Sequence, residues 1–360
     1  MIDFRYHLVS LIAVFLALAL GIVLGAGPLN EPLGEGLTGQ VEELREDRDR
    51  LRTELEVSQV EKEHRDVFLD EVAPATLGSR LEGRAVAVVT LPTANDEDVA
   101  DVRLRLEQAG AVVTGEIRVT EAWTDPGSAT FRSSFAGQIL GYLDPVPDDG
   151  VEPGVILGTA LGQALTRGDA DGAPTPDAQT LLELLTSADD PLVEVVDEPE
   201  QAANATVLVA PRTEETGPEE SADPADVETR EQRLTEEVAL ARGLATTGEG
   251  SVTAGSAATE LDLVSAIRAD STATETVTTT DSVADITGRI SVPMALAVAI
   301  SGEVGHYGMG TDATAAVPPT VYLPPPAPFQ PEDEPTGDDE GGAPDGGAHE
   351  EATDEPTDDA

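Results

Sequence analysis

Apolar and polar residues are arranged in four successive patterns along this chain, and the first is an unbroken apolar run at residues 8–27. The run holds twenty residues and no charged side chain. A helix rises about 1.5 Å per residue, so twenty residues cross the roughly 30 Å hydrocarbon core of a bilayer. We therefore expect a single transmembrane helix over residues 8–27, with the lipid bilayer as its partner.

Basic residues near the run indicate its orientation. Arg5 and the terminal amine precede the run, and the next basic residue is Arg45. Because basic residues favour the cytoplasmic side, we expect residues 1–7 in the cytoplasm and the bulk of the chain in the extracytoplasmic cell envelope. The alternative is a cleaved signal peptide. Residues 25–27 are small enough for a cleavage site, although the run exceeds the about 7–15 apolar residues of such peptides.

Small residues recur every four positions within this run, at Ala13, Ala17, Gly21 and Gly25. Residues with this spacing share one helix face, and small side chains let two membrane helices approach closely. The pattern favours self-association, although alanine and glycine are also common in spans of this composition.

Residues 37–69 combine a charged helical pattern with an apolar seam. The successive d positions of a heptad are Leu37, Leu44 and Leu51. Two of the a positions are also apolar, Val41 and Leu55. Such a seam is typical of parallel coiled coils, so we expect a coiled-coil stalk and a homo-oligomer. A single solvated helix is the alternative. We expect a polar joint at residues 28–36 and a helix break at residues 70–83.

Strand and helix patterns alternate from residue 84 onward. The apolar run at 85–91 predicts a strand buried on both faces, 96–108 predicts a helix and 111–119 predicts the next strand. Further helices are expected at 155–165, 181–185, 227–244 and 260–269, and further strands at 192–196, 206–210 and 251–254. Residues 288–301 are ambiguous because Pro293 interrupts an apolar run. The alternation predicts an α/β domain with a mostly parallel sheet over residues 84–310.

Residues 311–360 form the last pattern, first rich in proline and then acidic. Residues 331–360 hold thirteen acidic residues and no lysine or arginine. Such a segment cannot bury enough apolar surface to offset the entropy of ordering it. We expect residues 311–360 to be a disordered, Pro-rich acidic tail.

Composition restricts the partners and the chemistry. The formal charge of this 360-residue chain is -50, which argues against nucleic acid as a partner. Cysteine is absent, which excludes disulfides and thiolate metal sites. The chain has no G-x-S-x-G, H-E-x-x-H or P-loop motif, and its only lysine, Lys62, lies in the stalk. We expect that the protein is not an enzyme, and an extracytoplasmic hydrolase is a distant alternative.

One segment predicts a metal site. His306 and Met309 lie three residues apart in a glycine-rich stretch that could bring an imidazole and a thioether to one ion, and Met294 could add a second sulfur. Imidazole and thioether ligands suit copper. The alternative is a glycine-rich exit from the domain, in which hydrogen bonds satisfy His306.

Several stretches resemble the actinobacterial copper transport protein family typified by MctB. The most specific stretch is the apolar segment at residues 9–25 with its preceding Arg5. The stalk at 37–69 is also similar, as are four stretches of the domain, at residues 83–91, 95–98, 109–115 and 305–308. The resemblance covers roughly residues 1–310, and the acidic tail lies outside it.

The resemblance implies an envelope protein of copper transport and homeostasis that limits copper accumulation, with copper as the bound or transported ion and a channel-forming oligomer as the assembly. Membrane barrels need many alternating strands and aromatic girdles, whereas this chain has alternating helix and strand signals and 3% aromatic residues. We therefore retain the copper function and the envelope location without a barrel. The alternative is an oligomeric scaffold of the cell envelope with only indirect effects on copper.

Overall fold

The computed structural model describes residues 4–25, 31–148, 150–187, 190–212 and 224–329. The chain divides into two compact units, residues 1–76 and 77–360. The first unit consists of two helices, α1 (Phe4–Gly25) and most of α2 (Glu31–Leu77). The predicted joint at 28–36 is helical from Glu31, and its residues 28–30 lie outside the described part of the chain.

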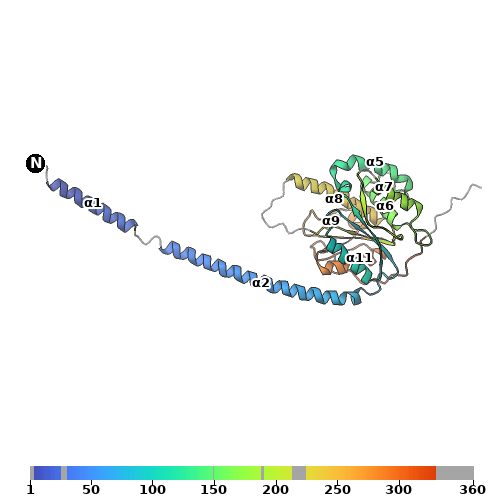
Figure 1. Cartoon of the computed structure of the whole chain (residues 1–360), viewed down its shortest axis with the longest axis horizontal. Coiled ribbons are helices and arrows are strands. Elements are labelled where there is room, and N and C mark those ends of the chain that lie inside the picture. Colours follow the sequence, from blue (N-terminus) through green and yellow to red (C-terminus); the bar gives the residue numbers. More distant parts are fainter. Residues whose placement is uncertain (1–3, 26–30, 149, 188–189, 213–223, 330–360) are drawn as a thin grey trace, which may run out of the picture. The chain divides into compact units, whose positions relative to one another are not determined.

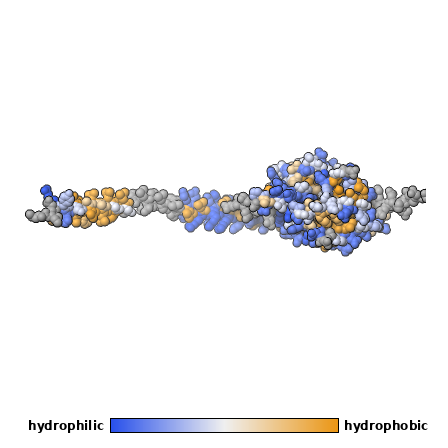
Figure 2. Space-filling model, turned by 90° about the horizontal axis from the view of Figure 1, so that it is seen from above, coloured by the Kyte–Doolittle hydropathy of each residue, from blue (hydrophilic) through white to orange (hydrophobic). Residues whose placement is uncertain are grey.

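Helix α1 has the length and the composition of a membrane span. Its 22 residues have a mean hydropathy of 2.8 over the most apolar window, and Figure 2 shows apolar surface along most of this helix. A signal sequence near an N-terminus has the same properties. Helix α1 includes residues 8–25 of the predicted span, and residues 26–27 lie outside the described part of the chain.

Helix α2 is longer than the sequence indicated. The break expected at 70–83 was wrong for its first part, because α2 continues through Pro74 to Leu77. Proline removes one backbone hydrogen bond, which is tolerable within the last turn of a helix. The break itself occurs at Gly78, where φ is +52° and a side chain would be strained.

The second unit is an α/β fold around one seven-stranded sheet (Figure 1). The strands lie in the order β3-β2-β1-β4-β5-β6-β7, and only β3 runs antiparallel to its neighbour. Their bounds are β1 Ala85–Thr90, β2 Val112–Val119, β3 Val193–Asp197, β4 Ala205–Val209, β5 Gly250–Ala254, β6 Thr278–Thr280 and β7 His306–Tyr307. The predicted mostly parallel sheet is confirmed.

Helices cover both faces of the sheet, since strand residues alternate between two buried clusters. Val86 and Val88 face the cluster that includes α3 and α11, whereas Ala87 and Val89 face the cluster that includes α5 to α9. The helices of the domain are α3 Asp96–Gln108, α4 Glu121–Thr124, α5 Ala129–Ile139, α6 Pro153–Thr166, α7 Pro176–Thr186, α8 Pro224–Ala245, α9 Leu263–Ala269, α10 Ala273–Thr276 and α11 Ile286–Ile300, with short 3-10 turns at Pro126–Ser128 and Leu140–Tyr142.

Most of the predicted elements of the domain lie where the sequence placed them. Helix α3 matches its predicted bounds, and Asn95 caps it by accepting hydrogen bonds from the backbone N–H groups of Glu97 and Asp98. The ambiguous segment at 288–301 is the helix α11, which continues through Pro293. The strand β6, a run of three threonines, and the two-residue strand β7 were not predicted, because neither has a hydrophobic period.

Residues 311–329 lie against the domain. Arg84 Nη2 donates a hydrogen bond to the Pro324 carbonyl over 2.9 Å, Thr314 Oγ1 donates to the His306 carbonyl over 2.7 Å, and Val321 and Leu323 pack on the α3–α11 cluster. The sequence placed the start of the tail at residue 311, whereas these contacts hold residues 314–324 on the domain. Residues 330–360 lie outside the described part of the chain.

Candidate functional site

The carboxyl edge of the parallel sheet collects the polar side chains that follow its strands. The chain runs outward from β1 to β2 and β3, and it then returns to place β4 on the other side of β1. Ligands of open α/β sheets bind at such a reversal, outside the carboxyl ends of the strands. Two cavities lie along this edge, and Arg212 lines both.

The first cavity, here called the switch-point cavity, lies beside the ends of β1 and β4. Its volume is about 260 Å³. Its charged lining is three arginines and three acids: Arg212, Arg230, Arg233, Glu121, Glu237 and Asp262.

Asp98 anchors one wall of this cavity. Its carboxylate is 1% exposed and accepts hydrogen bonds from Arg212 Nε and Nη2, both over 2.8 Å, and from Arg289 Nη1 over 3.0 Å. The two arginines come from the segment after β4 and from α11, so this carboxylate joins three elements across the carboxyl edge. A buried carboxylate with two guanidinium partners is satisfied, and its main role is structural.

The second cavity, here called the Ser282 cavity, lies beside the ends of β5, β6 and β7 and has a volume of about 510 Å³. Ser282 has a φ of +62°, a conformation that residues other than glycine rarely adopt. Its hydroxyl donates to Asp281 Oδ1 over 2.7 Å. Met309 and Gly310 complete the wall on the side of β7.

Asp281 and Arg268 form a buried ion pair beneath this cavity. The two side chains are 1% and 3% exposed, and their closest N–O distance is 2.9 Å. Asp281 also accepts hydrogen bonds from the N–H groups of Met309 and Gly310. Burial acts to raise the pKa of Asp281, but hydrogen bonds from Ser282, Met309, Arg268 and Gly310 outweigh it, so the pKa lies below its ordinary value.

His306 is part of the same network. Its Nε2 lies 3.0 Å from the Thr274 carbonyl oxygen, which can only accept, so Nε2 carries the hydrogen. Its Nδ1 therefore accepts from Thr279 Oγ1 over 2.9 Å, and that hydroxyl in turn accepts from Arg268 Nε. Burial lowers the pKa of His306, which favours the neutral form of the ring.

The structure gives the two predicted copper ligands different surroundings. The imidazole of His306 is buried with both nitrogens hydrogen-bonded, whereas Met309 is 65% exposed. Met294 is buried in the α3–α11 cluster. Among the described residues, no group of three or more histidine or acidic side chains is arranged to hold a metal ion. A copper ion on Nδ1 of His306 would have to displace the Thr279 hydroxyl.

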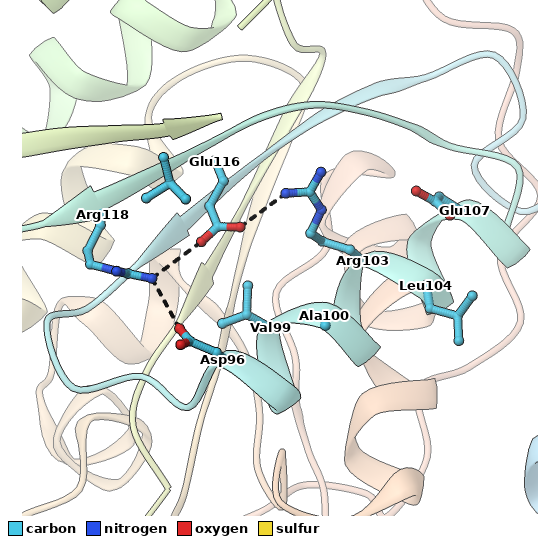
Figure 3. A pocket seen from close by; sticks show the side chains of 9 residues that line it. Asp96, Val99, Ala100, Arg103, Leu104, Glu107, Glu116 and Arg118 are labelled. Carbon is cyan, nitrogen blue, oxygen red and sulfur yellow. Dashed lines mark hydrogen bonds and ion pairs between the residues drawn. The ribbon is translucent and has the colours of Figure 1, made fainter. Parts of the chain in front are cut away.

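A third cavity lies between α3 and β2 (Figure 3). This open groove of about 520 Å³ holds Arg103, which donates to Glu116 over 3.1 Å, and Arg118, which donates to Asp96 over 3.1 Å. Arg103 also donates to Asp197. Because these charges are already paired with one another, the groove offers little to a ligand.

The predicted association residues lie on the first unit. A Cβ atom added at Gly21 or Gly25 would have no neighbour within 4 Å, and Ala13 and Ala17 are exposed. The seam residues Val41, Leu44, Leu51 and Leu55 are 43–67% exposed. The side chain of Leu37 lies outside those that the structure describes.

Sequence reasoning missed the arginine network of the carboxyl edge. Arg212 follows the predicted strand at 206–210 by two residues, and a polar residue at that position is a signal for the carboxyl edge. Asp281 could not be found in the same way, because the strand before it was not predicted.

Comparisons with known proteins point to one family. A family model described as "Copper transport outer membrane protein, MctB" matches residues 1–318. Copper transporter MctB of Mycobacterium tuberculosis (strain ATCC 25618 / H37Rv) is 32% identical over 320 residues, which cover 87% of this chain and 98% of that protein. Copper transporter MctB of Mycobacterium leprae (strain TN) is 30% identical over 334 residues, which cover 89% of this chain and 100% of that protein.

Proposed function

Because this chain belongs to the MctB family of copper transport proteins, we propose that it takes part in copper transport and homeostasis in the cell envelope and limits copper accumulation. The observation that carries the proposal is the extent of the match. It runs over residues 1–318 and thus includes both helices of the first unit and nearly all of the described domain. The relatives carry the name of copper transporters.

The proposed location follows from α1 and from the charges beside it. Helix α1 anchors the chain in a membrane, Arg5 lies on the cytoplasmic side, and the α/β domain lies outside the cytoplasm. The apolar helix with a mean hydropathy of 2.8 supports this arrangement. Copper would then be handled in the envelope, on the side that holds the domain.

The proposed assembly is a homo-oligomer that forms through α1 and α2. Small residues in register on α1 and exposed apolar residues on α2 support it, because no described residue of the chain covers either surface. Copper passage or binding at the axis of such an oligomer would not need a complete metal site within one domain.

Bulky residues on the small-residue face of α1 test the assembly. Replacing Gly21 and Gly25 by isoleucine should reduce crosslinked oligomers in membranes several-fold, because the helices can no longer approach closely. The control is Ala19→Ile with Val23→Ile, which has the same spacing but lies on the opposite face at about 100° per residue. Equal crosslinking of both variants and the parent would remove the association face from the proposal.

A copper titration of the full chain in detergent tests the function. We expect saturable uptake of Cu(I) or Cu(II) at micromolar concentration, weakened by Met309→Ala and further by adding His306→Ala. Met309 is exposed, so its removal should leave the fold intact, and the conservative Met294→Leu serves as the control.

Identical titrations for Met309→Ala, the double variant and the parent would remove these two ligands from the proposal. A parent that takes up no copper as an assembled oligomer would favour the second candidate, an envelope scaffold with indirect effects on copper. The observation in favour of the scaffold is that the described residues of one chain hold no cluster of three or more histidine and acidic side chains fit for a metal.

A further inference from the structure

We propose that the switch-point cavity binds a small anionic solute through a phosphate or carboxylate group, with Arg233 as the residue that binds it. Nothing in the copper function requires this site. The proposal rests on the place of the cavity in the fold, on one arginine with no direct hydrogen-bond or ion-pair partner among the described residues, and on the donors beside it.

The cavity occupies the position at which open α/β sheets bind ligands. It lies between the segments that follow β1 and β4, where the strand order reverses, and its walls include Thr93, Thr124 and the start of α9. Its volume of about 260 Å³ is below the 300–1,000 Å³ typical of pockets for drug-sized molecules. The ligand is therefore a small solute.

Arg233 distinguishes this cavity from the other charged places in the domain. It is half-buried on α8, and its Nε is shielded from water. Among the described residues no nitrogen of its guanidinium has a direct hydrogen-bond or ion-pair partner, and the charge of Glu237, four residues further along α8, acts on it without such a contact. Arg105, Arg132 and Arg289 also bury Nε without a hydrogen-bond partner, but each has a partner through another nitrogen. Shielding an unpaired cation from water is unfavourable, and a bound anion would relieve this cost.

The neighbouring arginines leave room for a second contact. Arg212 uses Nε and Nη2 on Asp98, so within the described part of the chain its Nη1 can donate to a further acceptor. Arg230 binds Glu237 through both Nη atoms and the Leu261 carbonyl through Nε, which fixes it as part of the wall. Guanidinium groups bind carboxylate and phosphate oxygens with paired hydrogen bonds.

Among the described residues, no acid of the cavity makes a direct ion pair with Arg233, and Glu237 acts on it only as a nearby charge. Glu237 is paired with Arg230, and Asp262 accepts the N–H groups of Ala258 and Thr259, both over 2.8 Å. Glu121 is exposed and forms no ion pair with Arg233. Its negative charge opposes an anion in the cavity, so its removal should strengthen binding.

The test is binding of inorganic phosphate and of citrate to the full chain in detergent, measured by calorimetry at constant ionic strength. We expect saturable binding of at least one probe, and the probe that binds identifies the phosphate or the carboxylate class. Arg233→Gln should weaken binding at least about tenfold, and Glu121→Gln should strengthen it several-fold. Arg242→Gln, which is on the same helix and pairs with Glu152 outside the cavity, should bind like the parent.

Two results would overturn the proposal. One is the lack of saturable binding of both probes by the parent. The other is equal affinity in the parent, Arg233→Gln and Glu121→Gln, because an adventitious ion on the surface would not respond to these residues. Circular dichroism checks that Arg233→Gln folds. If it does not, the expected gain in anion affinity of Glu121→Gln tests the proposal by itself, because the Glu121 side chain is exposed and its replacement should leave the fold intact.

Discussion

Replacement of Arg268 by methionine should lower the free energy of unfolding of the domain by about 3–5 kcal/mol, because Asp281 would then be a buried carboxylate without its cation. Arg268 donates to Asp281, Asp312, Thr279 Oγ1 and the Tyr307 carbonyl, all over 2.9–3.0 Å. It therefore fixes α9, β6 and the segment after β7 to one another. Urea denaturation of the full chain in detergent measures the change. The only tryptophan, Trp123, is fully buried in the domain and reports the transition by fluorescence.

Arg242→Gln is the matched control for this prediction. Its ion pair with Glu152 is on the surface, with side chains 24% and 63% exposed, so its loss should cost about 1 kcal/mol or less. If the two variants unfold at the same urea concentration as the parent, the Arg268–Asp281 pair does not stabilise the domain. A loss confined to Arg268→Met would assign the effect to the buried network.

Replacement of Gly243 by alanine should destabilise the domain by about 3 kcal/mol through a clash between helices α6 and α8. A Cβ atom at this position would lie 2.5 Å from the Thr159 backbone nitrogen and 2.6 Å from Gly158 Cα. Both neighbours are backbone atoms of a helix that is buried from Gly154 to Thr166, so neither can move aside without shifting the core. The same urea titration measures the effect.

Gly137→Ala is the control for this prediction. Gly137 lies within α5 and has no neighbour within 4 Å of an added Cβ atom, so alanine should stabilise the helix by about 0.5–1 kcal/mol. Opposite signs for the two glycines would show that the close approach of α6 and α8 is required. A neutral or stabilising Gly243→Ala would mean that the two helices separate at little cost.

Glycines at four-residue spacing occur within two of the described helices, α1 and α6, and the sequence could not distinguish their roles. Gly21 and Gly25 lie on an exposed helix, whereas Gly154, Gly158 and Gly162 lie on α6. Added Cβ atoms at Gly154 and Gly158 would come within 2.8 Å of atoms of α8. The spacing predicts a close helix contact in both places, but only the fold identifies the partner.

The candidate copper ligands show the same limit. The sequence placed His306 and Met309 three residues apart in a glycine-rich stretch, which shows only that both side chains could reach one ion. In the fold, β7 pairs with β6 and directs the imidazole toward Thr274 and Thr279, and Met309 is exposed at the Ser282 cavity. Strand pairing over two residues has no hydrophobic period, so no local pattern could indicate it.

The sequence by itself determined the apolar helix, the long charged helix and most of the strands and helices of the domain, because these depend on local hydrophobic period and capping. The tertiary structure alone decided which arginines pair with Asp98 and Asp281, that Arg233 lines a cavity without a direct partner among the described residues, and where the two cavities of the carboxyl edge lie. Among 70 acidic and 20 basic residues, many pairings are possible in sequence. The reversal of strand order between β1 and β4 selects the pairing of Asp98 with Arg212, since it brings these two residues, more than one hundred positions apart, to one edge of the sheet.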